Sequence, residues 1–241
     1  DAVVLGIEGG LSEDEARLLF DSRFSSEPKE FYSPDQPRDA EGQWSEGGDG
    51  VVVSNWNLNG EQEKNIQKLI RKHKFDTVDE QKAFARRLRR NGVDPEKMSL
   101  AEATMIDAYP YGSIGVPLNK ALREKSSDRQ LKSQADILSS ALENMPTYSG
   151  VSFRGTPLRQ DLVDKYEKMI DKTITEPGFL STSTSRGVAK RFLKMWQWGP
   201  TNKILTLYII KGKSGRRFEF VNPELRWGQE VLFDKGTKFK V

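Results

Sequence analysis

The run GFLSTSTS at residues 178–185 places two apolar residues directly before an unbroken series of serines and threonines. Residues 179–184 have the length and texture of a β-strand, in which side chains alternate between the two faces. Ser181 and Ser183 are then expected on one face of the strand and Thr182 on the other. Hydroxyl groups on a strand usually lie on an exposed face, but they also suit a carboxylate or a ribose. The rest of the sequence has to decide between these interpretations.

From residue 149 onward the pattern around this run predicts short strands with two intervening helices. The expected strands cover residues 151–154, 172–176, 179–184, 203–210, 216–220, 230–234 and 237–241, and the expected helices cover 159–170 and 186–196. Residues 61–145 instead have helical periodicity. Helices followed by strands indicate an α+β domain, with a helical part at 61–145 and a β-rich part at 149–241.

Local signals set the expected ends of the helices. Phe84 and Leu88 form an apolar stripe on a helix that should end at Asn91-Gly92, where glycine suits a left-handed cap. Asp94-Pro95 is expected to open the next helix. The sequence YPYG at residues 109–112 should break the chain, and further helices are expected at 116–123 and 128–142.

Residues 1–50 differ from the remainder in composition and charge. They carry 13 acidic and 4 basic side chains, whereas residues 51–241 carry 22 acidic and 34 basic ones. The first segment is rich in proline, glycine and serine, so we expect a largely flexible acidic leader with one short helix at 12–20. The basic body favours an anionic partner, such as a nucleotide, a nucleic acid or an acidic protein.

Several classes of function are made improbable by what the sequence lacks. There is no cysteine, which removes disulfides and thiolate zinc sites, and the one histidine, His73, lies on a polar helix face. No metal site is therefore expected. No stretch reaches the roughly 18 apolar residues that span a bilayer, and the first residues have no basic region of a signal peptide, so we expect a soluble protein.

The hydroxyl run at residues 181–183 and three other pieces of the second half carry the candidate chemistry. Arg154, near the end of a strand and beside Gly155, can present its planar guanidinium to a diphosphate. Glu230 begins an apolar strand, and a carboxylate there can stabilise positive charge developing at an anomeric carbon. Phe192 offers a flat face to an aromatic or cationic ring. Each piece alone is weak, since strand arginines and solvated glutamates are common.

Taken in order, these pieces resemble the Arg–Ser-Thr-Ser–Glu class of mono-ADP-ribosyltransferases, which includes bacterial toxins and phage-encoded enzymes. The similar segments are FRGT with Arg154, GFLSTS with residues 181–183, and QEVLF with Glu230, together with the upstream YPYGSIGVPLNKALRE. The resemblance covers roughly residues 60–241. It implies a split two-sheet β core and the cleavage of NAD, a substrate, at its nicotinamide glycosidic bond.

The resemblance also implies a role for each matching residue. Arg154 would contact the phosphates, the Gly155 backbone the nicotinamide amide, and Ser181 would orient the catalytic Glu230. Phe192 would stack near nicotinamide. The remaining expected NAD-binding residues are Thr156, Thr182 and Ser183, with Asn119 and Tyr111 on the adenosine side.

One position departs from the family pattern. The family usually has Glu or Gln two residues before the catalytic glutamate, where it helps to activate the acceptor, and this chain has Gly228 there, followed by Gln229. One interpretation is that Gln229 or Glu224 takes the role of the missing side chain, and the other is that transfer to the acceptor is altered. Gly228 itself is either the natural residue or an engineered one. The acceptor stays open, and arginine is favoured by its frequency in the family.

Three alternatives follow from these observations. The first is a transferase acting on a bacterial or phage-host protein. The second is a catalytically impaired or NAD-hydrolysing module of a phage or toxin particle. The third is a nucleic-acid-binding protein that uses the run RRLRR at residues 86–90. In addition, FYSPDQPRDAEGQWSEGG resembles a linker of phage head-morphogenesis proteins, which implies contact with virion proteins through residues 1–50 and a location in the virion and then in the host cytoplasm. The alternative location is that of a secreted or injected bacterial effector.

Overall fold

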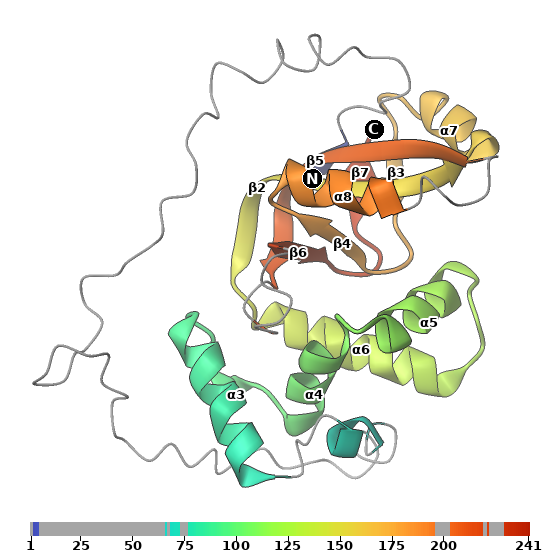
Figure 1. Cartoon of the computed structure of the whole chain (residues 1–241). Coiled ribbons are helices and arrows are strands. Elements are labelled where there is room, and N and C mark those ends of the chain that lie inside the picture. The colour runs from blue at the N-terminus through green and yellow to red at the C-terminus, as the bar shows by residue number, and fades with distance from the viewer. Residues whose placement is uncertain are drawn as a thin grey trace, which may run out of the picture. The chain divides into compact units, whose positions relative to one another are not determined.

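The computed structural model describes residues 2–4, 66, 68–72, 77–195, 203–218, 221 and 229–241. They belong to a compact unit formed by Asp1–Gly9 and Val53–Val241 (Figure 1). A second unit, Gly10–Val52, lies outside the described residues, and with it the helix expected at 12–20 and the phage-like phrase. His73 is also outside them.

The first complete helix, α3 (Val78–Arg90), follows the expected pattern. It buries Phe84 and Leu88, and the hydroxyl of Thr77 accepts a hydrogen bond from the Glu80 amide at its start. The chain leaves the helix through Gly92, whose φ of 76° is in the left-handed region that glycine tolerates best. The prediction of a glycine cap is therefore confirmed.

The helix expected to open at Asp94-Pro95 is wrong in its position. Pro95–Lys97 forms only a 3-10 turn, and helix α4 (Leu100–Ala108) begins after Ser99. Ser99 and Glu102 form a capping box, in which the Ser99 amide donates to Glu102 Oε2 at 2.6 Å and the Glu102 amide donates to Ser99 Oγ at 3.2 Å. This reciprocal pair supplies two partners to the helix start, so it outcompetes the proline as a start signal.

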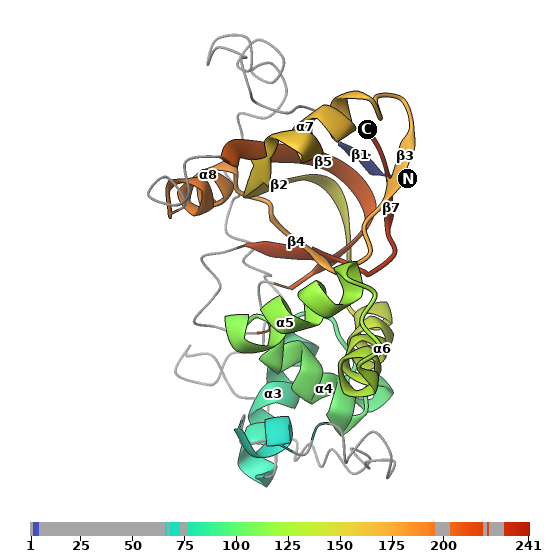
Figure 2. The ribbon, with the colours of Figure 1, turned by 90° about the vertical axis from the view of Figure 1, so that its right-hand side faces the viewer.

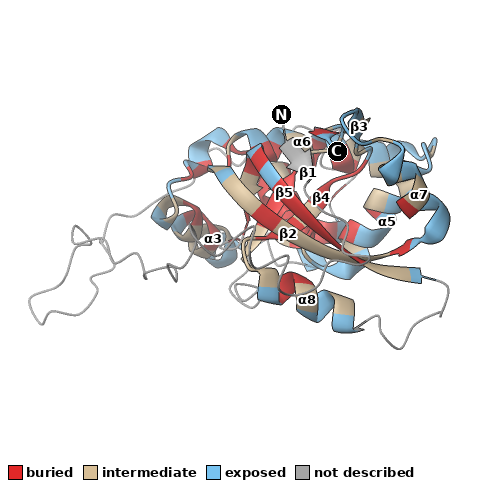
Figure 3. Ribbon diagram, turned by 90° about the horizontal axis from the view of Figure 1, so that it is seen from above, coloured by how far each residue is buried: buried red, intermediate tan, exposed pale blue. Residues whose placement is uncertain are grey.

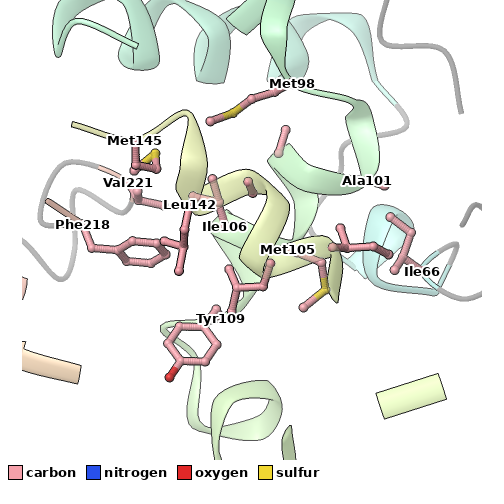
Figure 4. Close-up of a cluster of buried hydrophobic side chains, with 14 of the residues drawn as sticks. Ile66, Met98, Ala101, Met105, Ile106, Tyr109, Leu142, Met145, Phe218 and Val221 are labelled. Carbon is pink, nitrogen blue, oxygen red and sulfur yellow. The ribbon is translucent and has the colours of Figure 1, made fainter. Parts of the chain in front are cut away.

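Two further helices complete the helical part. Helix α5 (Gly112–Arg123) starts earlier than expected, directly after the break at Pro110, and α6 (Arg129–Glu143) is capped by Asp128. Figure 2 shows α4, α5 and α6 beside one another. The buried side chains of α3, α4 and α6 form one core with Phe179, Phe218 and Leu232 from the β-rich part. In Figure 4, Tyr109 lies at the margin of this core, with its hydroxyl directed away from the other labelled side chains.

Two long antiparallel strands form the centre of the sheet. Strand β2 (Thr147–Arg159) pairs along its length with β5 (Lys203–Arg217), with Arg154 opposite Tyr208. The two strands expected at 203–210 and 216–220 are thus one strand, and the intervening KGKSG is not a turn. The segment stays extended because its pairing with β2 continues, with Gly212 opposite Gly150 and Gly215 opposite Tyr148. A Cβ on Gly215 would lie 2.6 Å from Val231 Cγ1, so glycine also lets the neighbouring strand pack closely. Figure 3 shows that much of β5 is buried.

The described strands join in one hydrogen-bonded network of the order β2-β4-β6-β5-β1-β7-β3, with an added β2–β5 pairing. Strands β4 (Leu180–Ser183) and β6 (Glu230–Phe233) close a ring with β2 and β5, and β1 (Ala2–Val4), β7 (Lys238–Lys240) and β3 (Thr173–Thr175) continue from β5. The β2–β5 pairing joins the two groups of strands that were expected as split sheets. The predicted α+β class is confirmed.

One part of the expected leader belongs to this network. Residues Ala2–Val4 pair antiparallel with β5 and parallel with β7, with Val3 opposite Lys211 on one side and Lys240 on the other. The composition argument missed this short strand because it averaged over residues 1–50, which are mostly polar and acidic. Two helices pack on β2, namely α7 (Gln160–Glu167) and α8 (Arg186–Met195).

Candidate functional site

Strand pairing brings the three separated candidate residues together. Strand β4 lies between β2 and β6, with Ser183 opposite both Phe153 and Glu230. Arg154, Ser181 and Glu230 therefore line the same two cavities, of about 450 and 570 Å³. The sequence had predicted this convergence from residues 27 and more positions apart, and the geometry brings them to a shared cleft.

Direct hydrogen bonds connect the three residues. Arg154 Nη1 donates to the carbonyl oxygen of Ser181 at 2.7 Å. The Ser181 side chain is hydrogen-bonded to the Glu230 carboxylate. Ser181 is thus held by the arginine through its backbone and holds the glutamate through its hydroxyl. The arrangement fixes a carboxylate within a cleft while leaving other guanidinium N–H groups for a ligand.

Burial and charge act in opposite directions on this group. Burial raises the pKa of Glu230 above the ordinary value of a glutamate, although the Ser181 hydrogen bond and the Arg154 charge act to lower it. Burial also lowers the pKa of Arg154, and the positive charge of Arg123 adds to that effect. An anionic ligand near Arg154 and Arg123 would offset both the burial of the Arg154 charge and its repulsion by Arg123. The arginine side of the cleft therefore favours negative charge.

The other hydroxyls of the serine and threonine run have defined partners. Thr182 Oγ1 donates to the carbonyl of Val231 at 2.8 Å, and Ser183 Oγ accepts from the Ser185 amide at 3.0 Å. Both residues are buried and line the larger cavity. Their hydroxyls therefore fasten β4 to β6 and to the start of α8, which makes this wall of the cavity rigid.

Gly155, Thr156 and Phe192 also line the larger cavity, so the structure places them beside the expected ligand site. Gly155 has an additional packing reason, because a Cβ there would lie 2.1 Å from the carbonyl oxygen of Ala189 in α8. Helix α8 therefore approaches β2 at the glycine and brings Phe192 to the cavity. The aromatic ring is 41% exposed and is available to a flat ligand.

The tyrosine of the YPYG sequence that lines the smaller cavity is Tyr109, whereas the sequence had singled out Tyr111. Tyr111 is exposed at the start of α5 and is not among the described residues that line either cavity. Tyr109 is 4% exposed, and its ring packs edge-on against Phe179 and Phe218. Its helical spacing from Met105 and Ile106, both in the core, was the signal that could have found it.

The smaller cavity has a basic side formed by helix α5. Lys120 and Arg123 line it, and Arg123 Nε also pairs with Glu176 Oε1 at 2.9 Å. Asn119 lines the cavity too, but its described bonds are within the protein. It donates to the Tyr109 hydroxyl at 2.8 Å, and its Oδ1 accepts from the Phe179 amide at 2.7 Å.

The structure describes one of the two residues expected to serve the acceptor. Gly228 lies outside the described residues. Gln229 has a φ of 43°, and it is not among the described residues that line the two cavities. Its side-chain oxygen accepts from Thr184 Oγ1 at 3.1 Å, and its carbonyl accepts from the Thr184 amide at 3.0 Å. These bonds hold Gln229 against the end of β4.

The structure does not favour a nucleic-acid site on α3. Arg87 donates to the Val221 carbonyl at 2.5 Å, and Arg89 pairs with Glu96 at 3.0 Å. Arg86 and Arg90 are exposed. Half of the RRLRR cations thus have partners within the protein. Within the described residues, no group of three metal-ligating side chains could hold an ion and no helix is long and apolar enough to cross a membrane.

Comparisons with known proteins agree with this geometry. The family model of the ADP-ribosyltransferase exoenzymes matches residues 58–241. Mav of Mycobacterium avium, described as a candidate NAD(+)–arginine ADP-ribosyltransferase, is 35% identical over 126 residues, which are 52% of this chain and 14% of Mav. Vis of Vibrio splendidus, described in the same way, is 33% identical over 102 residues, which are 42% of this chain and 40% of Vis.

Solved structures show the same fold. The structure of Vis in complex with agmatine covers 76% of this chain and 80% of that chain, with a TM-score of 0.50 and 21% identity. The ADP-ribosyltransferase HopU1 of Pseudomonas syringae covers 76% of this chain and 90% of its own, with a TM-score of 0.55 and 14% identity. This chain spans 14% and 40% of the two curated relatives. From the match over residues 58–241, the chain belongs to the ADP-ribosyltransferase exoenzyme family.

Proposed function

We propose that this chain is an NAD-dependent mono-ADP-ribosyltransferase that acts on arginine in a protein. The observation that carries the proposal is the hydrogen-bonded set of Arg154, Ser181 and Glu230 at the junction of the two cavities. A cation, a hydroxyl and a half-buried carboxylate suit a ligand that carries a diphosphate next to a ribose. NAD has these groups, and its reactive bond lies at that ribose.

The proposed reaction breaks the bond between the anomeric carbon and nicotinamide. The bonding electron pair leaves with nicotinamide, whose ring nitrogen loses its positive charge, and the ribose becomes an oxocarbenium ion. Glu230 stabilises that cation and binds ribose hydroxyls, while Ser181 holds the carboxylate in place. A guanidino nitrogen of the acceptor then attacks the anomeric carbon and loses a proton to solvent.

The two cavities divide the substrate between them in this proposal. The larger one, with the Gly155 backbone, Thr156, Thr182, Ser183 and the Phe192 ring, receives the nicotinamide ribose. The smaller one, with its basic α5 side and Asn119, receives the adenosine side. Arg154 lines both cavities, and its guanidinium therefore suits the diphosphate that joins the halves.

An arginine acceptor is supported by the descriptions of Mav and Vis, and by the complex of Vis with agmatine, a guanidine compound. Gly228 has no side chain to assist the acceptor, and Gln229 is bonded to Thr184. A specific alternative is therefore NAD hydrolysis, in which water takes the place of the acceptor. A virion location or phage partners rest on the sequence of residues 31–48 alone and stay a prediction, as does delivery of the chain as an injected effector.

The test is incubation of the purified chain with labelled NAD, with and without a bacterial lysate or agmatine. The Glu230→Gln variant should release nicotinamide about a thousandfold more slowly, because it loses the charge that stabilises the oxocarbenium ion. Glu143→Gln, at the exposed end of α6, is the matched control and should behave as the unmodified chain.

A third variant, Gly228→Glu, separates transfer from hydrolysis. Equal labelling of agmatine by the unmodified chain and the variant supports a competent transferase. Nicotinamide release with labelling only in the variant supports the hydrolase alternative. Absence of nicotinamide release from every form would reject the proposed function.

A further inference from the structure

The side chain of Asn119 joins helix α5 to the strand that carries Ser181. Its Oδ1 accepts from the Phe179 amide at 2.7 Å, and its Nδ2 donates to the Tyr109 hydroxyl at 2.8 Å. The amide cannot be turned around, because its nitrogen would then face the Phe179 N–H, a donor against a donor. The Asn119 side chain thus accepts a hydrogen bond from the last backbone N–H before β4. At this residue the chain has not yet begun to pair with β6.

The neighbouring glycines leave space for this contact. A Cβ on Gly178 would lie 2.7 Å from Asn119 Oδ1, so a side chain there would displace the amide oxygen. A Cβ on Gly115 would lie 2.8 Å from the Tyr109 carbonyl oxygen and 3.4 Å from the Tyr109 ring. The glycine that opens the GFLSTS run therefore has a structural reason, which is the approach of Asn119.

The aromatic rings and an ion pair support the same junction. The rings of Tyr109 and Phe179 meet edge to face with centroids 5.6 Å apart. One helical turn beyond Asn119, Arg123 pairs with Glu176, which also accepts the Gly178 amide at 3.0 Å. Helix α5 is thus fixed to the segment before β4 by two contacts, and the position of β4 along the helix is defined.

We propose that Asn119 is a positioning residue, which sets β4 so that Ser181 faces Glu230 and its carbonyl meets Arg154. The inference rests on the proposed function, and it assigns Asn119 to the protein framework in place of direct contact with NAD. Only Leu180 separates Phe179 from Ser181, and a displacement at the strand start is carried along the extended backbone. The hydroxyl that holds Glu230 and the carbonyl that holds Arg154 would shift together.

The experiment compares Asn119→Ala, Gly178→Ala and Tyr109→Phe with the unmodified chain. Gly178 is not among the described residues that line either cavity, so its variant disturbs the contact without removing a group that faces the ligand. Asn144→Ala is the matched control, since Asn144 Nδ2 donates to the Lys97 carbonyl at 3.3 Å, away from both cavities. The measurements are kcat for nicotinamide release, the Kd for NAD, and exchange of the Phe179 amide by NMR.

We expect kcat to fall about tenfold to a hundredfold in Asn119→Ala and Gly178→Ala, because catalytic geometry is sensitive to small displacements. The Kd for NAD should change less than about threefold, and the Phe179 amide should exchange faster in both variants. Tyr109→Phe should show a smaller change of the same kind. The control should change none of the three quantities.

Two results would overturn the inference. One is a raised Kd with unchanged kcat in Asn119→Ala while Gly178→Ala behaves as the unmodified chain, which would make Asn119 a ligand contact. The other is unchanged exchange of the Phe179 amide in Asn119→Ala. If the unmodified chain releases no nicotinamide, the proposed function fails by itself, the catalytic part of the inference falls with it, and the exchange rates alone decide whether the junction exists.

Discussion

Glu230 is a carboxylate whose charge the fold disfavours although the proposed chemistry needs it. Burial raises the pKa of Glu230, and the Ser181 hydrogen bond with the Arg154 charge offsets only part of that effect. A carboxylate that is poorly solvated interacts strongly with any positive charge that develops beside it. The free energy that it costs to keep Glu230 charged in the free protein is thus linked to how strongly the carboxylate stabilises the ribose cation.

Glu230→Gln should raise the melting temperature at neutral pH, because the variant removes a charge that burial makes unfavourable. A raised pKa in the folded state means that the folded protein binds the proton more tightly than the unfolded chain, so the stability contributed is present at low pH and lost as pH rises through the folded pKa. The difference between variant and unmodified chain should therefore shrink as pH falls through the raised pKa of Glu230 toward the ordinary pKa of a glutamate. Calorimetry across pH checks this, and a difference that grows toward acid pH would contradict it.

Arg154→Lys should weaken NAD binding by about tenfold or more, even though the charge is kept. Arg154 already gives one N–H to the Ser181 carbonyl, and its fork leaves others for a phosphate, whereas a lysine ammonium cannot serve both in the same geometry. Titration of NAD binding measures the effect. Arg159→Lys is the matched control, since Arg159 is exposed and pairs with Asp161. Equal losses in both variants would indicate a general effect of charge.

At the scale of elements, the wall of the larger cavity depends on how closely α8 approaches β2. The helix lies against Gly155, where a Cβ would come within 2.1 Å of the Ala189 carbonyl and 2.7 Å of Leu193 Cγ. A backbone oxygen cannot rotate away as a side chain can. The spacing between the two elements is therefore set by the missing side chain, and so is the position of Phe192.

Gly155→Ala should move α8 outward, lower stability by about 1–3 kcal/mol and weaken NAD binding, because overpacking forces backbone shifts. Thermal unfolding and NAD titration measure the two effects. Gly187→Ala is the control, since its Cβ would meet only Ser185 Oγ at 3.6 Å, in the residue just before the same helix. A stable Gly155→Ala variant with normal NAD affinity would show that α8 adjusts freely.

The sequence predicted the elements better than their junctions. Local signals such as Gly92 and Asp128 act within a few residues, so the helix ends they mark were readable. The continuity of β5 depends on its pairing with β2, and the role of Tyr109 depends on a bond from Asn119. These contacts join residues distant in the chain, and a pattern along the chain does not contain them.

The candidate site was predictable to the same extent. Arg154, Ser181 and Glu230 were predicted from an ordered set of motifs, and the strands bring them to one cleft. The sequence singled out Tyr111, whereas Tyr109 lines the smaller cavity. Both tyrosines flank the same proline, and only the helix boundary decides which ring turns inward. The roles of Arg154, Ser181 and Glu230 toward NAD stay predictions.

At the scale of the whole molecule, strand β1 joins the beginning of the described chain to its end. Ala2–Val4 lies between β5 and β7, and Lys240 of β7 pairs with both Val3 and Thr173 of β3. Without β1, the described pairings of β7 and β3 with the rest of the sheet are interrupted. The sheet edge therefore depends on three residues of the acidic leader.

Removal of residues 1–9 should lower the melting temperature by roughly 2–4 °C, the shift expected for a loss near 1 kcal/mol in a domain of this size. Nicotinamide release at 25 °C should be retained, because β1 supplies no residue to either cavity among those described. Removal of residues 10–18 is the control of equal length. Identical melting of both shortened chains would contradict a stabilising role for β1.

The meeting of Val3 with Lys240 also has a consequence for biosynthesis. Strand β1 leaves the ribosome first and β7 last among the described strands, so the early strand must wait for nearly the entire chain before its parallel partner exists. Pairing across such a distance closes a long loop and slows assembly. We expect the helices to form while translation continues, and this edge to be completed only after β7 has emerged.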